Sequence, residues 1–111
     1  MLYINVDGSI RLTRGDTARF SVKINNDISD NEYDIQDNDE LKFSVKRKIK
    51  DETPCVQKSI TGTNTFIIEP QDTDRLAFGS YVYDVQLTTA GGDVYTVIEP
   101  TLFEILTEVT C

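Results

Sequence analysis

The chain has 111 residues, 39% of them hydrophobic, and a formal net charge of −8. This length predicts one folded domain over residues 1–111, with a core large enough to need no metal or disulfide. The acidic balance argues against nucleic-acid binding, which needs a surplus of Lys and Arg. No apolar run approaches the roughly 18 residues of a membrane span, and the N-terminus lacks an export signal. We therefore expect a soluble protein with no membrane and no nucleic-acid partner.

The first part of the chain predicts three extended segments. Residues 2–6 read as a short strand that ends at Asp7-Gly8, a common hairpin turn pair. Residues 10–14 continue extended as far as a turn at Gly15-Asp16. From 18 to 25 apolar and polar residues alternate strictly, which indicates a strand with one buried face.

The middle of the chain alternates between polar turns and short strands. Residues 26–40 form the most polar stretch and predict an exposed loop, with a short strand around Tyr33 and Ile35 inside it. Residues 41–46 alternate clearly and predict a second strand with one buried face. Two weaker strands are expected at 56–60 and 66–68, the latter stopped by Pro70.

The last third predicts the strongest strand, at 80–89, preceded by a single helical turn within 72–78. Residues 90–93 predict a hairpin turn in which two glycines supply positive φ. The closing strands are expected at 94–98 and 102–109, with Pro100 marking an edge, a bulge or a break between them.

A tyrosine pattern around the strongest strand points to a particular fold. Gly79, Tyr81 and Tyr83 precede Asp-Val-Gln-Leu, with the aromatic residues at period two. Immunoglobulin-type sandwiches place such a tyrosine at a corner between sheets, where its hydroxyl reaches upstream backbone and the residue two positions later enters the core. Tyr81 is then the corner tyrosine and Tyr83 a core residue. With about 7–9 short strands and no apolar pattern of helical period, we expect an all-β, immunoglobulin-like antiparallel β-sandwich.

Two charged segments are candidates for binding. The acidic loop 26–40 holds seven carboxylates, of which Asp37, Asp39 and Glu40 are the best calcium candidates, although the spacing is not that of an EF-hand and solvation is the simpler reading. The only basic cluster comprises Lys46-Arg47-Lys48 and Lys50, which we interpret as a solvated strand face.

Histidine is absent from the chain, and among its 19 acidic residues no two are marked out as a catalytic carboxylate pair. The absence of histidine excludes Ser-His-Asp and Cys-His arrangements and histidine-bound zinc within the chain. The two cysteines, Cys55 and Cys111, are expected as free thiols, and whether they ever pair stays open. We therefore expect no enzyme activity and no cofactor. Exposed tyrosines such as Tyr33 or Tyr95 could serve a carbohydrate-binding surface only if several share one face.

Three segments together resemble a known family. They are Arg14-Gly15-Asp16-Thr17, the strand Asp39–Lys46, and Asp72–Leu87 with its Leu-x-x-Gly-x-Tyr-x-Tyr-Asp-Val sequence. The pattern is similar to the N-terminal domain of upper baseplate proteins from phages of Gram-positive bacteria, small immunoglobulin-like sandwiches of phage and prophage tails. The resemblance covers roughly residues 9–108, and its motifs relate to fold, so no catalytic residue carries over.

The resemblance implies a structural role. We expect a non-enzymatic virion or prophage-particle component, assembled in the bacterial cytoplasm, that docks on other tail or baseplate proteins by protein–protein contacts. Self-association into a homo-oligomer stays open. The alternative is a β-sandwich that binds carbohydrate or another cell-surface component through aromatic and acidic loops.

Overall fold

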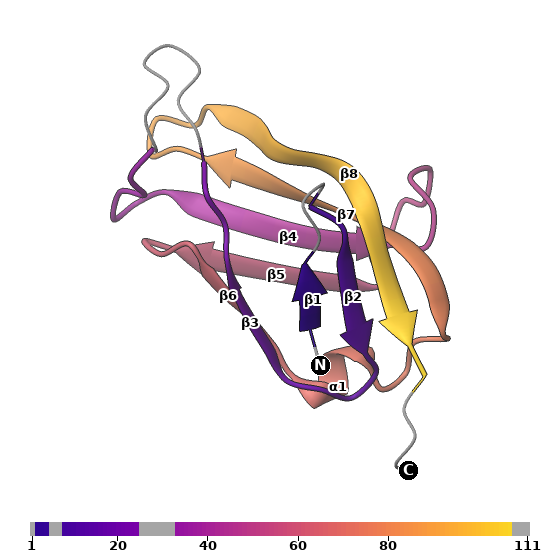
Figure 1. The fold of residues 1–111 in the computed structure, drawn as a ribbon. Coiled ribbons are helices and arrows are strands. Elements are labelled where there is room, and N and C mark those ends of the chain that lie inside the picture. The colour runs from indigo at the N-terminus through magenta and orange to yellow at the C-terminus, as the bar shows by residue number, and fades with distance from the viewer. Residues whose placement is uncertain (1, 5–7, 25–32, 108–111) are drawn as a thin grey trace.

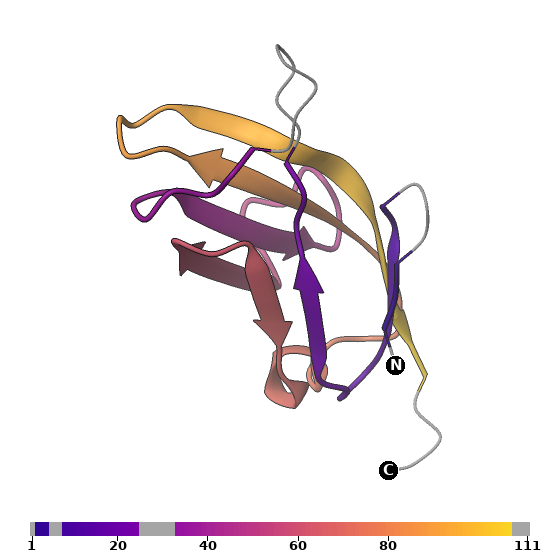
Figure 2. The same cartoon turned by 60° about the vertical axis from the view of Figure 1, so that its left-hand side comes forward.

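In the computed structural model, residues 2–4, 8–24 and 33–107 are described. They form two sheets (Figure 1), and the larger has six strands in the order β1-β2-β8-β7-β4-β5. Its strands are β1 (Leu2–Ile4), β2 (Ile10–Thr13), β4 (Glu40–Lys46), β5 (Val56–Thr61), β7 (Gly79–Thr88) and β8 (Val94–Leu106). The smaller sheet pairs β3 (Ala18–Ser21) with β6 (Thr65–Ile68). Figure 2 shows this pair lying across one face of the curled larger sheet.

The arrangement confirms the all-β, immunoglobulin-like sandwich. The chain passes between the sheets at the β2–β3 turn, and β7 is flanked by β4 and β8 in antiparallel register. One pair departs from the expected antiparallel pattern, because β2 runs parallel to β8, with Ile10 opposite Phe103 and Leu12 opposite Ile105. Parallel neighbours need a long crossover connection, and here nearly the whole domain lies between these two strands.

The core between the sheets is built from the predicted alternating residues. Aromatic rings from both sheets meet there, and Phe43 of β4 has its ring centroid 5.4 Å from that of Phe20 and 5.6 Å from that of Phe66. One hydrophobic cluster contains the buried residues Ile10, Leu12, Ala18, Phe20, Val22, Ile24, Leu41, Phe43, Val45, Val56, Phe66, Ile68, Tyr81, Tyr83, Val85, Leu87, Phe103 and Ile105. The apolar residues predicted to face the core at 18–24, 41–45 and 81–87 are therefore buried, although β3 itself ends at Ser21 and the last residue of the strand predicted at 18–25 lies outside the described residues.

Two details of the closing hairpin correct the sequence expectation. The last strand is continuous from Val94 to Leu106, instead of being broken into two strands at Pro100. The irregularity is taken up as register shifts against β7 between Tyr83 and Gln86, close to where Pro100 lies in β8. In the turn, Gly92 has φ of 91°, while Gly91 does not adopt positive φ. The turn therefore uses one glycine with positive φ, instead of the two that the sequence predicted.

The helical turn also lies earlier than expected. Helix α1 spans Pro70–Thr73, whereas the sequence placed the turn within 72–78. Pro70 starts this helix as well as ending a strand, because a proline at the first helical position loses no intrahelical hydrogen bond. The backbone amide of Glu69 donates to Asp72 Oδ2 at 2.7 Å, which caps the turn.

Some expectations fall outside the described residues. These are the Asn5-Val6 end of the first strand, Asp7 of its turn, residues 26–32 of the acidic loop, the end of the closing strand at 108–109, and Cys111. Among the residues that are described, no helix is long and apolar enough to cross a membrane.

Candidate functional site

The corner before β7 is held by Tyr81. Its ring is 4% exposed and its hydroxyl donates to the carbonyl oxygen of Ala77 at 2.8 Å, the upstream backbone contact expected of a corner tyrosine. The guanidinium carbon of Arg47 lies 4.7 Å from the centre of the same ring. Gly79 has φ of 127°, and a Cβ there would lie 3.3 Å from the Arg47 guanidinium nitrogens, so the position favours glycine in both conformation and space.

Tyr83 lies two residues further on, in the core. Its ring centroid is 5.5 Å from that of Phe43 and 6.1 Å from that of Phe103, and its hydroxyl donates to the carbonyl oxygen of Gly8. The tyrosine therefore packs between strands of the larger sheet and also fixes the segment that follows the β1–β2 turn. Gly79, Tyr81 and Tyr83 are structural residues.

The calcium candidates do not converge. Asp39 is 2% exposed, and its Oδ2 accepts hydrogen bonds from the Tyr33 hydroxyl at 2.6 Å and from the Gln36 amide at 2.9 Å. Asp37 is exposed and Glu40 begins β4. Within the described segments, no group of three or more metal-ligating side chains gathers. Asp39 instead closes the loop through these hydrogen bonds. The prediction that the whole of loop 26–40 is exposed is therefore wrong at Asp39.

The Tyr33–Asp39 hydrogen bond also changes both acidities. The bond from Tyr33 holds the pKa of Asp39 below its ordinary value of 3.8, helped by the Gln36 amide and opposed by burial. The same bond raises the pKa of Tyr33 above 10.0. No strand forms at residues 33–36, which the structure describes as irregular, so the short strand expected there is a further correction. The backbone amide of Tyr33 donates to Ile24, which joins this loop to the end of the β3 segment.

The four tyrosines whose side chains are described, Tyr33, Tyr81, Tyr83 and Tyr95, do not form a shared aromatic platform. Tyr81 and Tyr83 are buried, Tyr33 is half-buried against the core, and Tyr95 is 55% exposed. Tyr33 and Tyr95 are near enough to influence one another electrostatically, but the hydroxyl of Tyr33 is committed to Asp39. Among the described residues, the tyrosines therefore do not provide a glycan-binding surface of several exposed rings.

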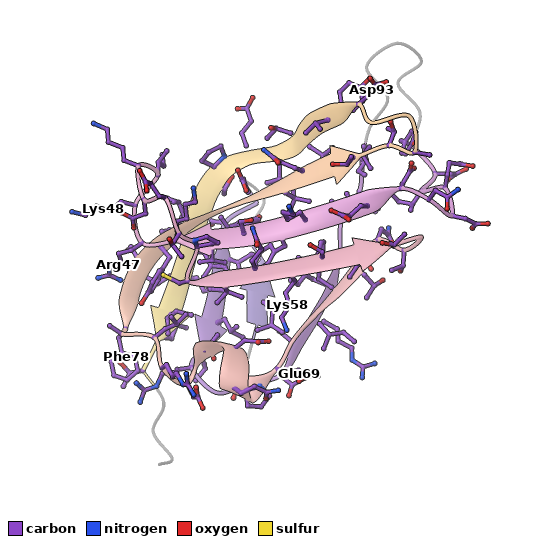
Figure 3. The ribbon with its side chains drawn as sticks, turned by 180° about the vertical axis from the view of Figure 1, so that it is seen from behind. Arg47, Lys48, Lys58, Glu69, Phe78 and Asp93 are labelled. Atoms are coloured by element: carbon purple, nitrogen blue, oxygen red, sulfur yellow. The ribbon has the colours of Figure 1, made fainter. Side chains whose placement is uncertain are left out.

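The outer face of the larger sheet carries a shallow apolar depression. It is lined by Ser44, Lys46, Ile49, Val82, Tyr83, Asp84 and Pro100. Next to it, Leu102 is 42% exposed and stands opposite Val82 in the β7–β8 register. The volume of the depression, about 290 Å³, includes open solvent. The depression is therefore too open to enclose a small molecule, whereas a protein surface could cover it. Figure 3, a view from behind that of Figure 1, has this outer face toward the viewer.

The sequence pattern did not nominate these outward apolar residues. Val82 stands at an outward position between Tyr81 and Tyr83, among the polar outward residues Ser80 and Asp84. An apolar residue on the polar side of an alternating strand is a signal that could have identified this face. Leu102 gave no such signal, because its pairing with Val82 depends on the register of the hairpin.

Cys55, before β5, is exposed and free. Its backbone amide donates to the carbonyl oxygen of Val45, so it closes the β4–β5 connection through its backbone.

Comparison of the chain with protein-family models, with curated proteins and with solved structures gave no match. The functional inference accordingly depends on the three segments that carry the resemblance, on the fold, on the exposed apolar residues and on the distribution of charge.

Proposed function

We propose that this protein is a non-enzymatic structural component of a phage or prophage tail or baseplate, and that it docks on neighbouring particle proteins through protein–protein contacts. Its place would be the virion or prophage particle. What supports the proposal is the position of the three segments that carry the resemblance. All three build the sandwich itself: a turn between sheets, a central strand and the tyrosine corner.

The first of these segments shows how closely the motifs follow the fold. Gly15, in the β2–β3 turn, donates its amide to the Thr73 hydroxyl at 2.9 Å and so joins the turn to α1. The second segment is β4, which has strand neighbours on both sides. The third places Tyr81 and Tyr83 as described above. All three motifs occupy positions that stabilise the fold, as expected of a protein that contacts its partners through its surface.

Docking would use the outer face of the larger sheet. Leu102 and Ile49 are 42% and 62% exposed, and the depression that Ile49 lines combines apolar groups with one cation and one carboxylate. Specific protein contacts combine a buried apolar centre with a polar rim. This face offers both on strands that are fixed by the sandwich.

Co-sedimentation tests the proposal. Particles are induced from the strain that encodes the protein and separated on a density gradient, and each fraction is blotted for this chain. We expect it to travel with intact tails. A protein confined to the soluble fractions would overturn the tail assignment and favour a free binding module, including one for cell-surface carbohydrate.

A pair of matched variants tests the docking face. Leu102→Asp places a charge on the outer face, and Ile67→Asp places the same charge on β6 of the other sheet, where the residue is 41% exposed. We expect Leu102→Asp to fall out of the tail fractions while Ile67→Asp remains. Equal retention of both variants would remove the outer face from the docking model.

A further inference from the structure

The two ends of β4 carry opposite charge. At its start lie Glu40, the loop residues Asp34 and Asp37, and Asp93 of the β7–β8 turn, and at its end lie Lys46, Arg47, Lys48 and Lys50. Figure 3 shows Asp93 and Lys48 well apart, toward opposite ends of the strands of the larger sheet. The seven residues of β4 alone separate the ends by about 20 Å, which is more than the Debye length of about 8 Å at physiological salt. The two ends therefore do not neutralise each other within one chain.

The basic end is a structured turn with an apolar centre. Residues 46–52 contain four cations and two carboxylates, in a chain whose net charge is −8. One of those carboxylates, Asp51, accepts a hydrogen bond from the Lys48 amide at 3.0 Å and so shapes the turn. Ile49 lies between the cations and is 62% exposed.

The acidic end has the complementary composition. Asp34, Asp37 and Asp93 are exposed, and residues 33–40 include no cation. Val94 and Tyr95 follow Asp93 and are 57% and 55% exposed. Asp39, which is buried, holds this end together: its backbone carbonyl accepts the Gly62 amide at 3.0 Å, joining the loop to the β5–β6 turn.

We propose that the acidic end of one copy docks on the basic end of a second copy, with Ile49 of one against Val94 and Tyr95 of the other. Each end is an apolar centre surrounded by charged groups, with a net positive charge at 46–52 and a net negative charge at the other end, so a second copy of this chain is the occupant that the surface fits. Such head-to-tail contacts produce rings when the rotation closes and filaments when it does not. The inference deepens the proposed tail function by naming one docking partner.

The small size of the two ends determines what the contact should look like. Interfaces below about 1,200 Å² of total buried area are usually weak and transient. Association should therefore appear only at high protein concentration and should depend strongly on salt, because charged rims contribute most when screening is low. Within a particle, repetition of the contact would compensate for its weakness.

Sedimentation velocity of the purified chain over a wide concentration series tests the proposal. We expect concentration-dependent association at about 50 mM NaCl that weakens by about tenfold or more at about 500 mM, where the Debye length is several-fold shorter. A chain that stays monomeric throughout, or that associates independently of salt, overturns the proposal.

Charge reversal identifies the ends. One variant, Lys48→Glu with Lys50→Glu, makes the basic end acidic, and a second, Asp37→Lys with Asp93→Lys, makes the acidic end basic. Each variant alone should be monomeric, and mixing the two should restore association because complementary ends then face each other. Arg19→Glu with Arg75→Glu is the matched control for the first variant, since it makes the same change in net charge at exposed positions away from both ends.

The outcomes separate this inference from the tail assignment. Association that survives either reversal, or that mixing fails to restore, overturns the head-to-tail contact. If the protein is monomeric but co-sediments with tails, only the head-to-tail self-contact is overturned. If it self-associates but is absent from the tail fractions, only its assignment to a tail or baseplate is overturned.

Discussion

Tyr81, Tyr83 and Tyr33 each pack a ring against the core and direct the hydroxyl to a different acceptor. Tyr81 bonds Ala77, Tyr83 bonds Gly8, and Tyr33 bonds the carboxylate of Asp39. The first two acceptors are backbone carbonyls in connecting segments, so the hydroxyls fix loops relative to strands. The third acceptor is charged, which gives its hydrogen bond a dependence on pH.

Replacing Tyr81 by Phe should cost about 1 kcal/mol in the free energy of unfolding, the usual net value of one hydrogen bond. The ring and its contact with Arg47 are kept, so the change isolates the bond to Ala77. Tyr83→Ala should cost about 3–5 kcal/mol, because it removes a large side chain that is 3% exposed. Denaturant unfolding measures both, and equally negligible losses would contradict the corner assignment.

Asp39 should make the protein's stability sensitive to acid. Because the folded state lowers the pKa of Asp39 below its ordinary 3.8, chiefly through Tyr33, its contribution is fully present above that value and is lost as the pH falls through the folded pKa. Tyr33 has the opposite sign: its pKa is raised, so its contribution is present below pH 10.0 and is lost as the pH rises through the folded pKa.

Denaturant unfolding between neutral pH and about pH 2 separates this effect from that of the other carboxylates. The proteins compared are the wild type, Tyr33→Phe and Asp39→Asn. We expect Tyr33→Phe to lose about 1.5–3 kcal/mol at neutral pH, the range for a hydrogen bond to a charged group, and to lose less on acidification than the wild type. Stability curves that run parallel in pH for all three proteins would show that the pair does not titrate with folding.

At the scale of elements, α1 is a short helical turn whose position is fixed by side chains on both sides. Lys58 of β5 pairs with Asp72 at 2.8 Å, and Thr73, fully buried, accepts the Gly15 amide. One turn of helix thereby joins the edge of the larger sheet to the turn between sheets. The helix has only four residues, so these contacts, more than helix propensity, hold it in place.

Thr73→Val should cost about 1–3 kcal/mol, because the shape is kept while the Gly15 amide loses its acceptor. Thr73→Ser keeps the hydroxyl and loses only a methyl group. Hydrogen exchange of the Gly15 amide distinguishes the two losses: we expect faster exchange in Thr73→Val and wild-type protection in Thr73→Ser. Unchanged exchange in the valine variant would mean that the hydroxyl does not hold the turn.

Alternation was a reliable guide to the strands because burial on one face leaves a local trace. Ala18, Phe20 and Val22 are buried as their spacing predicted, and so are Leu41 and Phe43. The tyrosine corner was recognisable for a related reason, since its glycine and two tyrosines stand at fixed local offsets.

Features decided by distant contacts were missed. Pairing of β2 with β8 leaves no local signature, because either strand alone would pack equally well in other positions. Pro100 was expected to mark an edge, a bulge or a break; β8 passes through it with a register shift, so the bulge is confirmed and the division into two strands is wrong. Asp39 resembles its exposed neighbours in sequence, yet it is 2% exposed and accepts hydrogen bonds from Tyr33 and Gln36.

The candidate surfaces were only partly predictable. The clusters of opposite charge and their places before and after the strand at 41–46 were visible in the sequence, but the addition of Asp93 to the acidic end depends on the pairing of β4 with β7. The sequence did not predict Ile49 and Tyr95 as docking residues, because single exposed apolar residues are common on protein surfaces. Their significance comes from the charged rims around them.

At the scale of the whole molecule, Phe43 joins the two sheets. Its ring lies within 5.4–6.0 Å, between centroids, of four other rings: Phe20 and Phe66 from the smaller sheet, and Tyr83 and Phe103 from the larger one. Sheets that pack face to face are held by such interdigitated side chains. Because Phe43 is fully buried and touches both layers, its removal should weaken the adhesion of one sheet to the other.

Phe43→Ala should therefore cost about 3–5 kcal/mol in the free energy of unfolding, a large share of the roughly 5–15 kcal/mol that holds a typical domain together. Phe78→Ala is the matched control: its ring is 42% exposed and lies under the Arg14 guanidinium at 4.3 Å, so its loss should cost about 1 kcal/mol or less. Urea unfolding monitored by tyrosine fluorescence and by far-ultraviolet circular dichroism measures both variants. Similar losses for the two phenylalanines would mean that the sheets adhere through a distributed surface, and that Phe43 is no more than one member of it.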